Sequence, residues 1–169
     1  MIVETFYPCE YMPSVYAVPF EQFWEKGMRG VIFDIDNTLV PHGAPADERI
    51  VELFRILREI GYATCLLSNN KENRVSSFAG QVESPYIFKA GKPGTANYKK
   101  AMKQMGTDEQ TTLFVGDQLF TDVWGANRAG IYSILVKPID PKEEIQIILK
   151  RYPEKAVLWL YERSRRSSR

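Results

Sequence analysis

The sequence predicts an α/β fold, a three-layer sandwich around a central, mostly parallel, five-stranded sheet. Short and nearly continuously apolar runs alternate along the chain with longer segments of helical period. Such runs are typical of central strands in a parallel sheet, because both faces of these strands are buried. The alternation of strand and helix indicates right-handed crossovers that place helices on both faces of the sheet.

Four apolar runs are predicted to be central strands, and a fifth, weaker segment is predicted to be an edge strand. The central strands are residues 30–35 (GVIFDI), 62–67 (YATCLL), 112–116 (TLFVG) and 131–136 (IYSILV). The edge strand is predicted at residues 86–89 (YIFK), where the apolar run is shorter.

The segments between these runs are predicted to be helices. Residues 47–60 place Ile50, Phe54 and Leu57 on one face and are followed by Gly61, a residue that commonly ends helices. A further helix is expected between Ser68 and Lys92. Other helices are predicted over residues 94–105, 121–129, 141–150 and about 154–165.

The chain is expected to form a single domain, residues 1–169, with a flanking segment at each end of the core. Residues 1–28 are rich in aromatic residues and proline, and are expected to wrap the sheet before a short helix through Phe23 and Trp24. Residues 29–150 are the expected catalytic core, and residues 151–169 a helix with a basic tail. The last helix is apolar all round at residues 157–161, so it should pack within the chain or across a subunit contact, and an oligomer is compatible with it.

Composition narrows the class of function. The chain has 22 basic and 21 acidic residues, so its overall charge gives no indication of nucleic acid binding.

Two cysteines, Cys9 and Cys65, favour neither a disulfide framework nor a zinc site, and fit a reducing cytoplasm. No 18-residue apolar run and no basic leader are present, so neither a transmembrane helix nor a signal peptide is expected. The arginines of the tail could contact an anionic surface or simply be solvated.

Polar residues follow the predicted strands at the points where the strands end. Because ligands of open α/β sheets bind outside the carboxyl ends of the strands, these residues are candidates for one site. They are Asp34, Asp36 and Thr38 after the first strand, Ser68 and Asn69 after the second, Lys92 after the edge strand, and Asp117 and Asp122 after the fourth.

This set of groups suits phosphoryl transfer to a carboxylate. The negative charges of a carboxylate and a phosphate must be compensated before they can approach, and Mg²⁺ held by oxygen ligands can do so. A lysine and backbone N–H groups can neutralise the other phosphoryl oxygens. A second carboxylate can protonate the leaving alkoxide and later activate water.

Four segments resemble the motifs of haloacid-dehalogenase-like (HAD) phosphatases, in the same order. They are residues 34–39 (DIDNTL), Ser68 after the run 65–67, residues 91–93 (GKP), and Gly116-Asp117 with Asp122. The aromatic arm and the absence of a cap resemble the YqeG-type HAD phosphatases of class IIIA, which are related to mitochondrial phosphatidylglycerophosphate phosphatases. The resemblance implies a HAD-like, Rossmannoid fold and a Mg²⁺-dependent enzyme.

The resemblance also implies a role for each residue. It makes Asp34 the nucleophile and Asp36 the general acid/base, and it makes Asp34, Asp117 and the backbone carbonyl of Asp36 the metal ligands. Ser68, the backbone of Asn69, and Lys92 would bind the phosphoryl group. Thr38 would steady the loop, and Asp122 would orient a metal-bound water or Lys92.

The spacing of these motifs leaves no room for a cap domain. Only 34 residues separate Asp34 from Ser68, and 24 separate Ser68 from Lys92, whereas a separate domain usually needs about 50 residues or more. An open cleft favours a large substrate, one presented on a surface, or closure by another subunit. The resemblance implies phosphatidylglycerophosphate or a related phosphomonoester, with peripheral membrane contact.

Two other classes of function stay open. A receiver domain also combines acidic residues with a lysine, but its lysine lies late in the chain and it lacks the second acid of the Asp34–Asp36 pair. A HAD scaffold could also serve as a phosphate-dependent binding or assembly partner, although such a scaffold would usually have lost Asp34, Asp36 or Lys92. His42, the only histidine, is expected to contact substrate at most.

Overall fold

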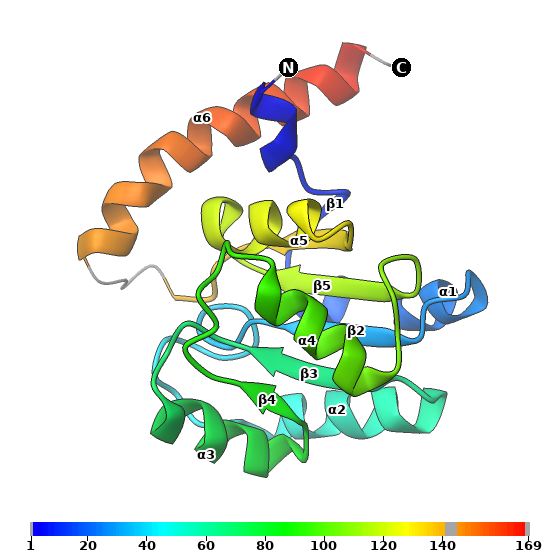
Figure 1. The fold of residues 1–169 in the computed structure, drawn as a ribbon. Coiled ribbons are helices and arrows are strands. Elements are labelled where there is room, and N and C mark those ends of the chain that lie inside the picture. The colour runs from blue at the N-terminus through cyan, green and yellow to red at the C-terminus, as the bar shows by residue number, and fades with distance from the viewer. Residues whose placement is uncertain (1, 141–144, 168–169) are drawn as a thin grey trace.

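The computed structural model describes residues 2–140 and 145–167 and shows a parallel sheet of six strands (Figure 1). The order across the sheet is β1-β6-β5-β2-β3-β4, and every pairing is parallel. The strands are β1 (Glu10–Met12), β2 (Gly30–Phe33), β3 (Ala63–Leu67), β4 (Tyr86–Ile87), β5 (Thr112–Gly116) and β6 (Tyr132–Val136). The predicted α/β sandwich is therefore confirmed, and the five predicted strands are all present.

The sixth strand, β1, corrects the expected number of five. It comes from the segment that was expected only to wrap the sheet, and it pairs with β6 in the register Glu10↔Ile134. Its three side chains are all partly exposed. A short edge strand of this kind carries no apolar run, so its pairing with β6 rather than its own pattern determines its conformation.

Helices cover both faces of the sheet, as the βαβ alternation predicts. One face packs against α1 (Phe20–Glu25), α2 (Glu48–Ile60) and α3 (Glu72–Val82). The other packs against α4 (Ala96–Met105) and α5 (Trp124–Arg128). Two one-turn helices, η1 (Ile2–Phe6) and η2 (Val15–Ala17), precede α1.

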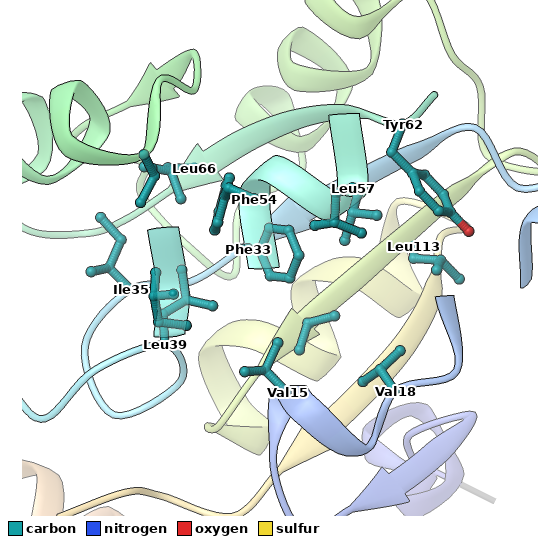
Figure 2. Close-up of a cluster of buried hydrophobic side chains, with 14 of the residues drawn as sticks. Val15, Val18, Phe33, Ile35, Leu39, Phe54, Leu57, Tyr62, Leu66 and Leu113 are labelled. Carbon is teal, nitrogen blue, oxygen red and sulfur yellow. The ribbon is translucent and has the colours of Figure 1, made fainter. Parts of the chain in front are cut away.

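The first of these faces forms the larger core. Figure 2 shows side chains of β2, α2 and the loop after β2 converging there, including Phe33, Phe54 and Leu39. Phe33 and Phe54 are fully buried, and their ring centroids are 5.2 Å apart. Asp47 is the N-cap of the helix that carries Phe54, and its carboxylate accepts a hydrogen bond from the Ile50 N–H at 2.8 Å.

The region after β5 differs from the predicted single helix over residues 121–129. A π-helical turn, η3 (Leu119–Val123), leads directly into the short helix α5. The wider turn keeps Asp122 buried and directed back at the end of β5, where its carboxylate accepts hydrogen bonds from the N–H groups of Asp117 and Gln118. π-helical turns are often found at functional sites, and this one lies beside the candidate site.

The C-terminal segment is one helix, α6 (Ile145–Ser167), where two helices were expected over residues 141–150 and 154–165. Residues 141–144 lie outside the described part of the chain. Pro153 lies inside α6, although a proline in a helix interior removes a hydrogen bond and so predicts a break. Figure 1 shows α6 running past η1, so that both ends of the chain lie on the same side of the molecule.

The apolar run of α6, residues 157–161, is partly packed against the rest of the chain and partly exposed to solvent. Val157 and Leu158 pack against Leu119, Val123 and Leu135. Trp159 on the same run is 58% exposed, so the run packs within the chain on one side only.

Between β2 and Lys92, where every residue is described, no cap domain interrupts the sandwich: a loop and α2 fill the segment between β2 and β3, and α3 and β4 fill the next. Among the described residues, no helix is both long and apolar enough to cross a bilayer.

Candidate active site

The candidate site lies at the carboxyl ends of three adjacent strands. In the sheet β2 is flanked by β5 and β3, so Asp34, Asp117 and Ser68 are brought to one edge. A cavity of about 340 Å³ opens there, and Asp34, Asp36, Ser68, Asn69, Lys92 and His42 are among the residues that line it. The sequence-predicted residues are thus placed around one cavity or directly behind it.

The Lys92 ammonium group joins two of the carboxylates. Lys92 Nζ donates to Asp34 Oδ1 at 2.7 Å and to Asp122 Oδ1 at 2.6 Å, and all three side chains are buried. Burial alone lowers the pKa of Lys92, but Asp122 and Asp34 outweigh burial and raise that pKa above its ordinary value. These contacts therefore favour the charged form of Lys92, which lines the cavity.

Asp34 has a shifted pKa. Burial raises the pKa of Asp34 to about 6, the positive charge of Lys92 opposes this shift, and the neighbouring carboxylate of Asp122 adds to it. A buried carboxylate with little solvation is a reactive oxygen nucleophile once it is ionised. A cation bound beside it would favour the ionised form.

Asp117 faces Asp34 across the hydroxyl group of Thr38. Thr38 Oγ1 lies 3.0 Å from Asp117 Oδ1 and 3.4 Å from Asp34 Oδ2. Burial raises the pKa of Asp117 well above its ordinary value, and the charges of Asp34 and Asp122 raise it further, while Arg151 opposes the shift. Carboxylate oxygens of Asp34, Asp117 and Asp122 all lie within 4.8 Å of one another.

These oxygens fit a hard divalent cation such as Mg²⁺, which prefers carboxylate ligands and needs only one or two of them. Asp122 is the least suited of the three, because Lys92 and two backbone N–H groups bond its two oxygens. Asp34 Oδ2 and Asp117 Oδ1, which share the Thr38 hydroxyl, are the better placed pair.

Gly116 has a steric reason to be glycine. A Cβ atom at Gly116 would lie 2.5 Å from Oδ2 of Asp122 and 2.6 Å from its Cγ. Asp122 therefore occupies the space of the missing side chain, and from there reaches Lys92. Glycine at position 116 is thus required by close packing at the end of β5.

Asp36 is held by groups that the sequence analysis did not identify. Its Oδ1 accepts hydrogen bonds from the Gly43 N–H at 2.8 Å and from Arg74 Nη2 at 2.9 Å, and its Oδ2 accepts one from Asn70 Nδ2 at 3.2 Å. Burial raises the pKa of Asp36, but these three donors outweigh burial and hold the pKa below its ordinary value. In this arrangement the contact with Arg74 favours the ionised form of Asp36.

The second and third predicted segments are tied to each other through Asn69. Its side chain accepts from the Lys92 N–H at 2.8 Å and donates to the Lys92 carbonyl at 3.2 Å. Ser68 Oγ accepts from the Asn70 N–H at 3.1 Å, which fixes the turn after β3. The Asn69 side chain thus positions the loop that carries Lys92.

Arg151 of α6 is the other residue that the sequence analysis missed. Its guanidinium Nη2 donates to Asp117 Oδ2 at 2.5 Å. The helix that carries it, α6, follows the last strand in the chain. The sequence gives a weak indication of Arg74, because this residue lies in the first turn of α3, shortly after Ser68. Arg151 has none, because only the packing of α6 brings it to the site.

Comparison with known proteins agrees with this geometry. The HAD-hydrolase-like family model matches residues 89–138, which include Lys92, Asp117 and Asp122. A probable phosphatase, YqeG of Bacillus subtilis, is 34% identical over 159 residues, which cover 94% of this chain and 92% of that protein. The chain belongs to the YqeG-type HAD-superfamily phosphatases. This YqeG-type protein is therefore a phosphatase that acts on a phosphate ester.

A more distant relative has a defined substrate in its name. The phosphatidylglycerophosphate phosphatase 1 of Arabidopsis thaliana, chloroplastic/mitochondrial, is 26% identical over 147 residues, which cover 78% of this chain and 40% of that protein. Among solved structures, a putative subfamily III A HAD hydrolase of Legionella pneumophila has a TM-score of 0.54 at 15% identity, and the match covers 78% of this chain and 75% of that chain. That likeness agrees with the HAD fold.

Proposed function

We propose that this YqeG-type phosphatase is a Mg²⁺-dependent phosphomonoesterase that works through an aspartyl-phosphate on Asp34. The position of Asp34 carries the proposal: one oxygen contacts the buried Lys92 ammonium group, and the other faces Asp117 across Thr38. Lys92 balances the charge of Asp34 on one side, and a cation held by Asp34 and Asp117 would balance it on the other, as attack on a phosphate dianion requires.

Asp34, Asp117 and the backbone carbonyl of Asp36 would hold the Mg²⁺ ion. When bound, the ion would draw negative charge from a phosphate oxygen and from the two carboxylates. Lys92 would neutralise another phosphoryl oxygen, together with the Ser68 hydroxyl and the backbone N–H of Asn69. Thr38 would steady the loop after β2, and Asp122 would keep Lys92 in place through its 2.6 Å contact.

The reaction would take two steps. Asp34 would attack phosphorus and form the aspartyl-phosphate as the bond to the ester oxygen breaks, and Asp36 would donate a proton to that oxygen. Water would then attack the aspartyl-phosphate, Asp36 would accept a proton from the water, and inorganic phosphate and free Asp34 would result. Asp36 must carry a proton in the first step, so the substrate would have to separate it from Arg74.

We propose phosphatidylglycerophosphate as the substrate. The chain is similar to the phosphatidylglycerophosphate phosphatase of Arabidopsis, and its cavity lies at the sheet edge with no cap domain over it. An open site would admit a headgroup presented at a membrane surface, and the exposed arginines of α6 would favour contact with anionic lipid. The protein would then act in the cytoplasm, with peripheral membrane contact.

Hydrolysis of p-nitrophenyl phosphate in the presence of Mg²⁺ would test the nucleophile. We expect Asp34→Asn to abolish turnover and the matched variant Glu109→Gln, an exposed acid beside Gly130, to retain it. Equal rates in the parent and in Asp34→Asn would reject the proposed nucleophile. Phosphate release from phosphatidylglycerophosphate in mixed micelles would test the substrate, and efficient turnover of only soluble sugar or nucleotide phosphates would reject it.

A further inference from the structure

We infer that Arg151 of α6 competes with the divalent metal for Asp117 and thereby sets the metal affinity of the site. The inference rests on the proposed function, because it takes Asp117 to be a metal ligand. It concerns a residue that no motif of the sequence includes and that α6 alone delivers to the site.

The contact between Arg151 and Asp117 is close and largely buried. Nη2 lies 2.5 Å from Asp117 Oδ2, and Nη1 donates to the Asp117 backbone carbonyl at 2.7 Å. The Asp117 side chain is fully buried, and that of Arg151 is 15% exposed. An ion pair in such a setting is screened far less than one at the surface. Arg151 therefore contributes a positive potential at Asp117, opposite in sign to the effects of burial, Asp34 and Asp122.

A guanidinium group in this position opposes a second cation. Its positive charge lies within hydrogen-bonding distance of the carboxylate that would hold the metal, so it repels any divalent ion that approaches the same group. It also occupies Oδ2 directly, while the Thr38 hydroxyl takes Oδ1. A metal that binds Asp117 would therefore share the carboxylate with these two donors, and its charge would be opposed by that of the guanidinium group.

Arg151 has other partners to which it can shift. Nη1 also donates to Glu154 Oε2 at 2.9 Å, and Glu154 Oε1 accepts from the Leu119 N–H at 3.1 Å. Glu154 is itself buried, so it can keep the guanidinium group paired when Oδ2 is given up. The exchange therefore avoids leaving an unpaired buried charge, which would be far more costly.

The same contact links the metal site to the docking of α6. Arg151 and Glu154 form polar contacts with the segment after β5. Further along the helix, Val157 and Leu158 pack against an apolar cluster that includes Leu119, and the ring of Tyr161 contacts that of Tyr7. By thermodynamic reciprocity, a metal that weakens the Arg151–Asp117 contact must also weaken the docking of this part of α6.

Direct titration with Mn²⁺, followed by the loss of its free-ion electron paramagnetic resonance signal, would test the inference. We expect Arg151→Gln to bind Mn²⁺ about tenfold more tightly than the parent. Arg151→Lys, which keeps the charge but loses the planar fork, should fall between them. Arg163→Gln, an exposed arginine of the same helix, should bind as the parent does. Unchanged or weaker binding in Arg151→Gln would overturn the inference, since weaker binding would mean that Arg151 positions Asp117 for the metal.

Hydrogen exchange of the parent protein provides a second measurement that needs no variant. Saturating Mg²⁺ should speed amide exchange in residues 151–161 of α6, and unchanged or slower exchange would overturn the inference. Asp117→Asn separates this failure from that of the proposed function. If the parent and Asp117→Asn bind Mn²⁺ equally, Asp117 is not a ligand and both ideas fail. If only Asp117→Asn loses binding while Arg151→Gln equals the parent, the inference alone fails.

Discussion

Arg74 Nη2 lies 2.9 Å from Asp36 Oδ1, so a side chain of α3 holds the proposed proton donor in its ionised form. The pair is largely buried, with 17% of the Arg74 side chain and 14% of the Asp36 side chain exposed. The Gly43 N–H adds a further bond to the same oxygen. These contacts suit the step in which Asp36 accepts a proton from water, and oppose the step in which it donates one.

Replacing Arg74 by glutamine should therefore change the pH dependence of catalysis. Arg74 helps to lower the pKa of Asp36, so its removal should raise that pKa. Asp36 would then stay protonated to higher pH, and the basic limb of kcat for an alkyl phosphomonoester should move to higher pH. Turnover of p-nitrophenyl phosphate, whose leaving group needs no proton, should keep its basic limb in place. A shift of the alkyl limb to lower pH would contradict the assigned role of Asp36.

The buried Asp34 should make stability depend on pH when metal is chelated. Folding raises its pKa from 3.8 to about 6, so the stability it contributes is complete below about pH 4 and is lost as pH rises through 6. Asp34→Asn stays neutral and should avoid this loss. In chelator, urea unfolding should show equal stabilities at low pH and an advantage for Asp34→Asn on the order of 3 kcal/mol at neutral pH. A parent that is equal or superior in stability at neutral pH would contradict the burial argument.

Gly116→Ala should disable the site although it adds only one methyl group. The new Cβ would collide with the Asp122 carboxylate at 2.5 Å and push it away from Lys92 and from the Asp117 N–H. We expect kcat/KM to fall about a hundredfold, as is typical when groups that orient a metal site are displaced. Gly80→Ala in α3 is the matched control, because its Cβ would meet nothing within 4 Å. Equal activity of the two variants would show that Asp122 can move without consequence.

The two cysteines should differ sharply in reactivity. Cys65 is fully buried, and burial raises the pKa of its thiol to about 12, with Lys100 opposing the shift. Cys9 is exposed. A thiol-specific reagent at about pH 8 should modify one thiol quickly in the folded protein and two in denaturant, because only a thiolate in contact with solvent reacts. The Cys9→Ser variant should lose the fast phase, and a persistent fast phase would show that Cys65 is accessible.

Much of the fold follows from local patterns. The runs that became β2, β3, β5 and β6 are apolar on both faces, and only a buried parallel strand places both faces out of water. The helix α2 could be placed to within one residue because Asp47, its apolar face and Gly61 agree with one another. Where several local signals agree in this way, the bounds of an element can be predicted without knowledge of the tertiary packing.

Other elements depend on partners that are distant in sequence. The strand β1 forms through its pairing with β6. The helix α6 continues through Pro153, although the local preference of proline predicts a break. The site shows the same division. Asp34, Ser68, Lys92 and Asp117 could be predicted from strand ends, whereas Arg151 reaches Asp117 only through the docking of α6. A side chain that reaches the site only through tertiary packing cannot be predicted from the residues around it in the sequence.

The pairing of β1 with β6 has a consequence for the order of assembly. Cys9, which precedes β1, donates its backbone N–H to the carbonyl of Ser133, 124 residues further along the chain. During synthesis the first strand of the sheet therefore emerges long before the strand it must join. The central strands β2, β3 and β5 can associate in the meantime. The N-terminal segment can pair only after β6 has been synthesised, and α6, which carries Arg151, follows β6 along the chain.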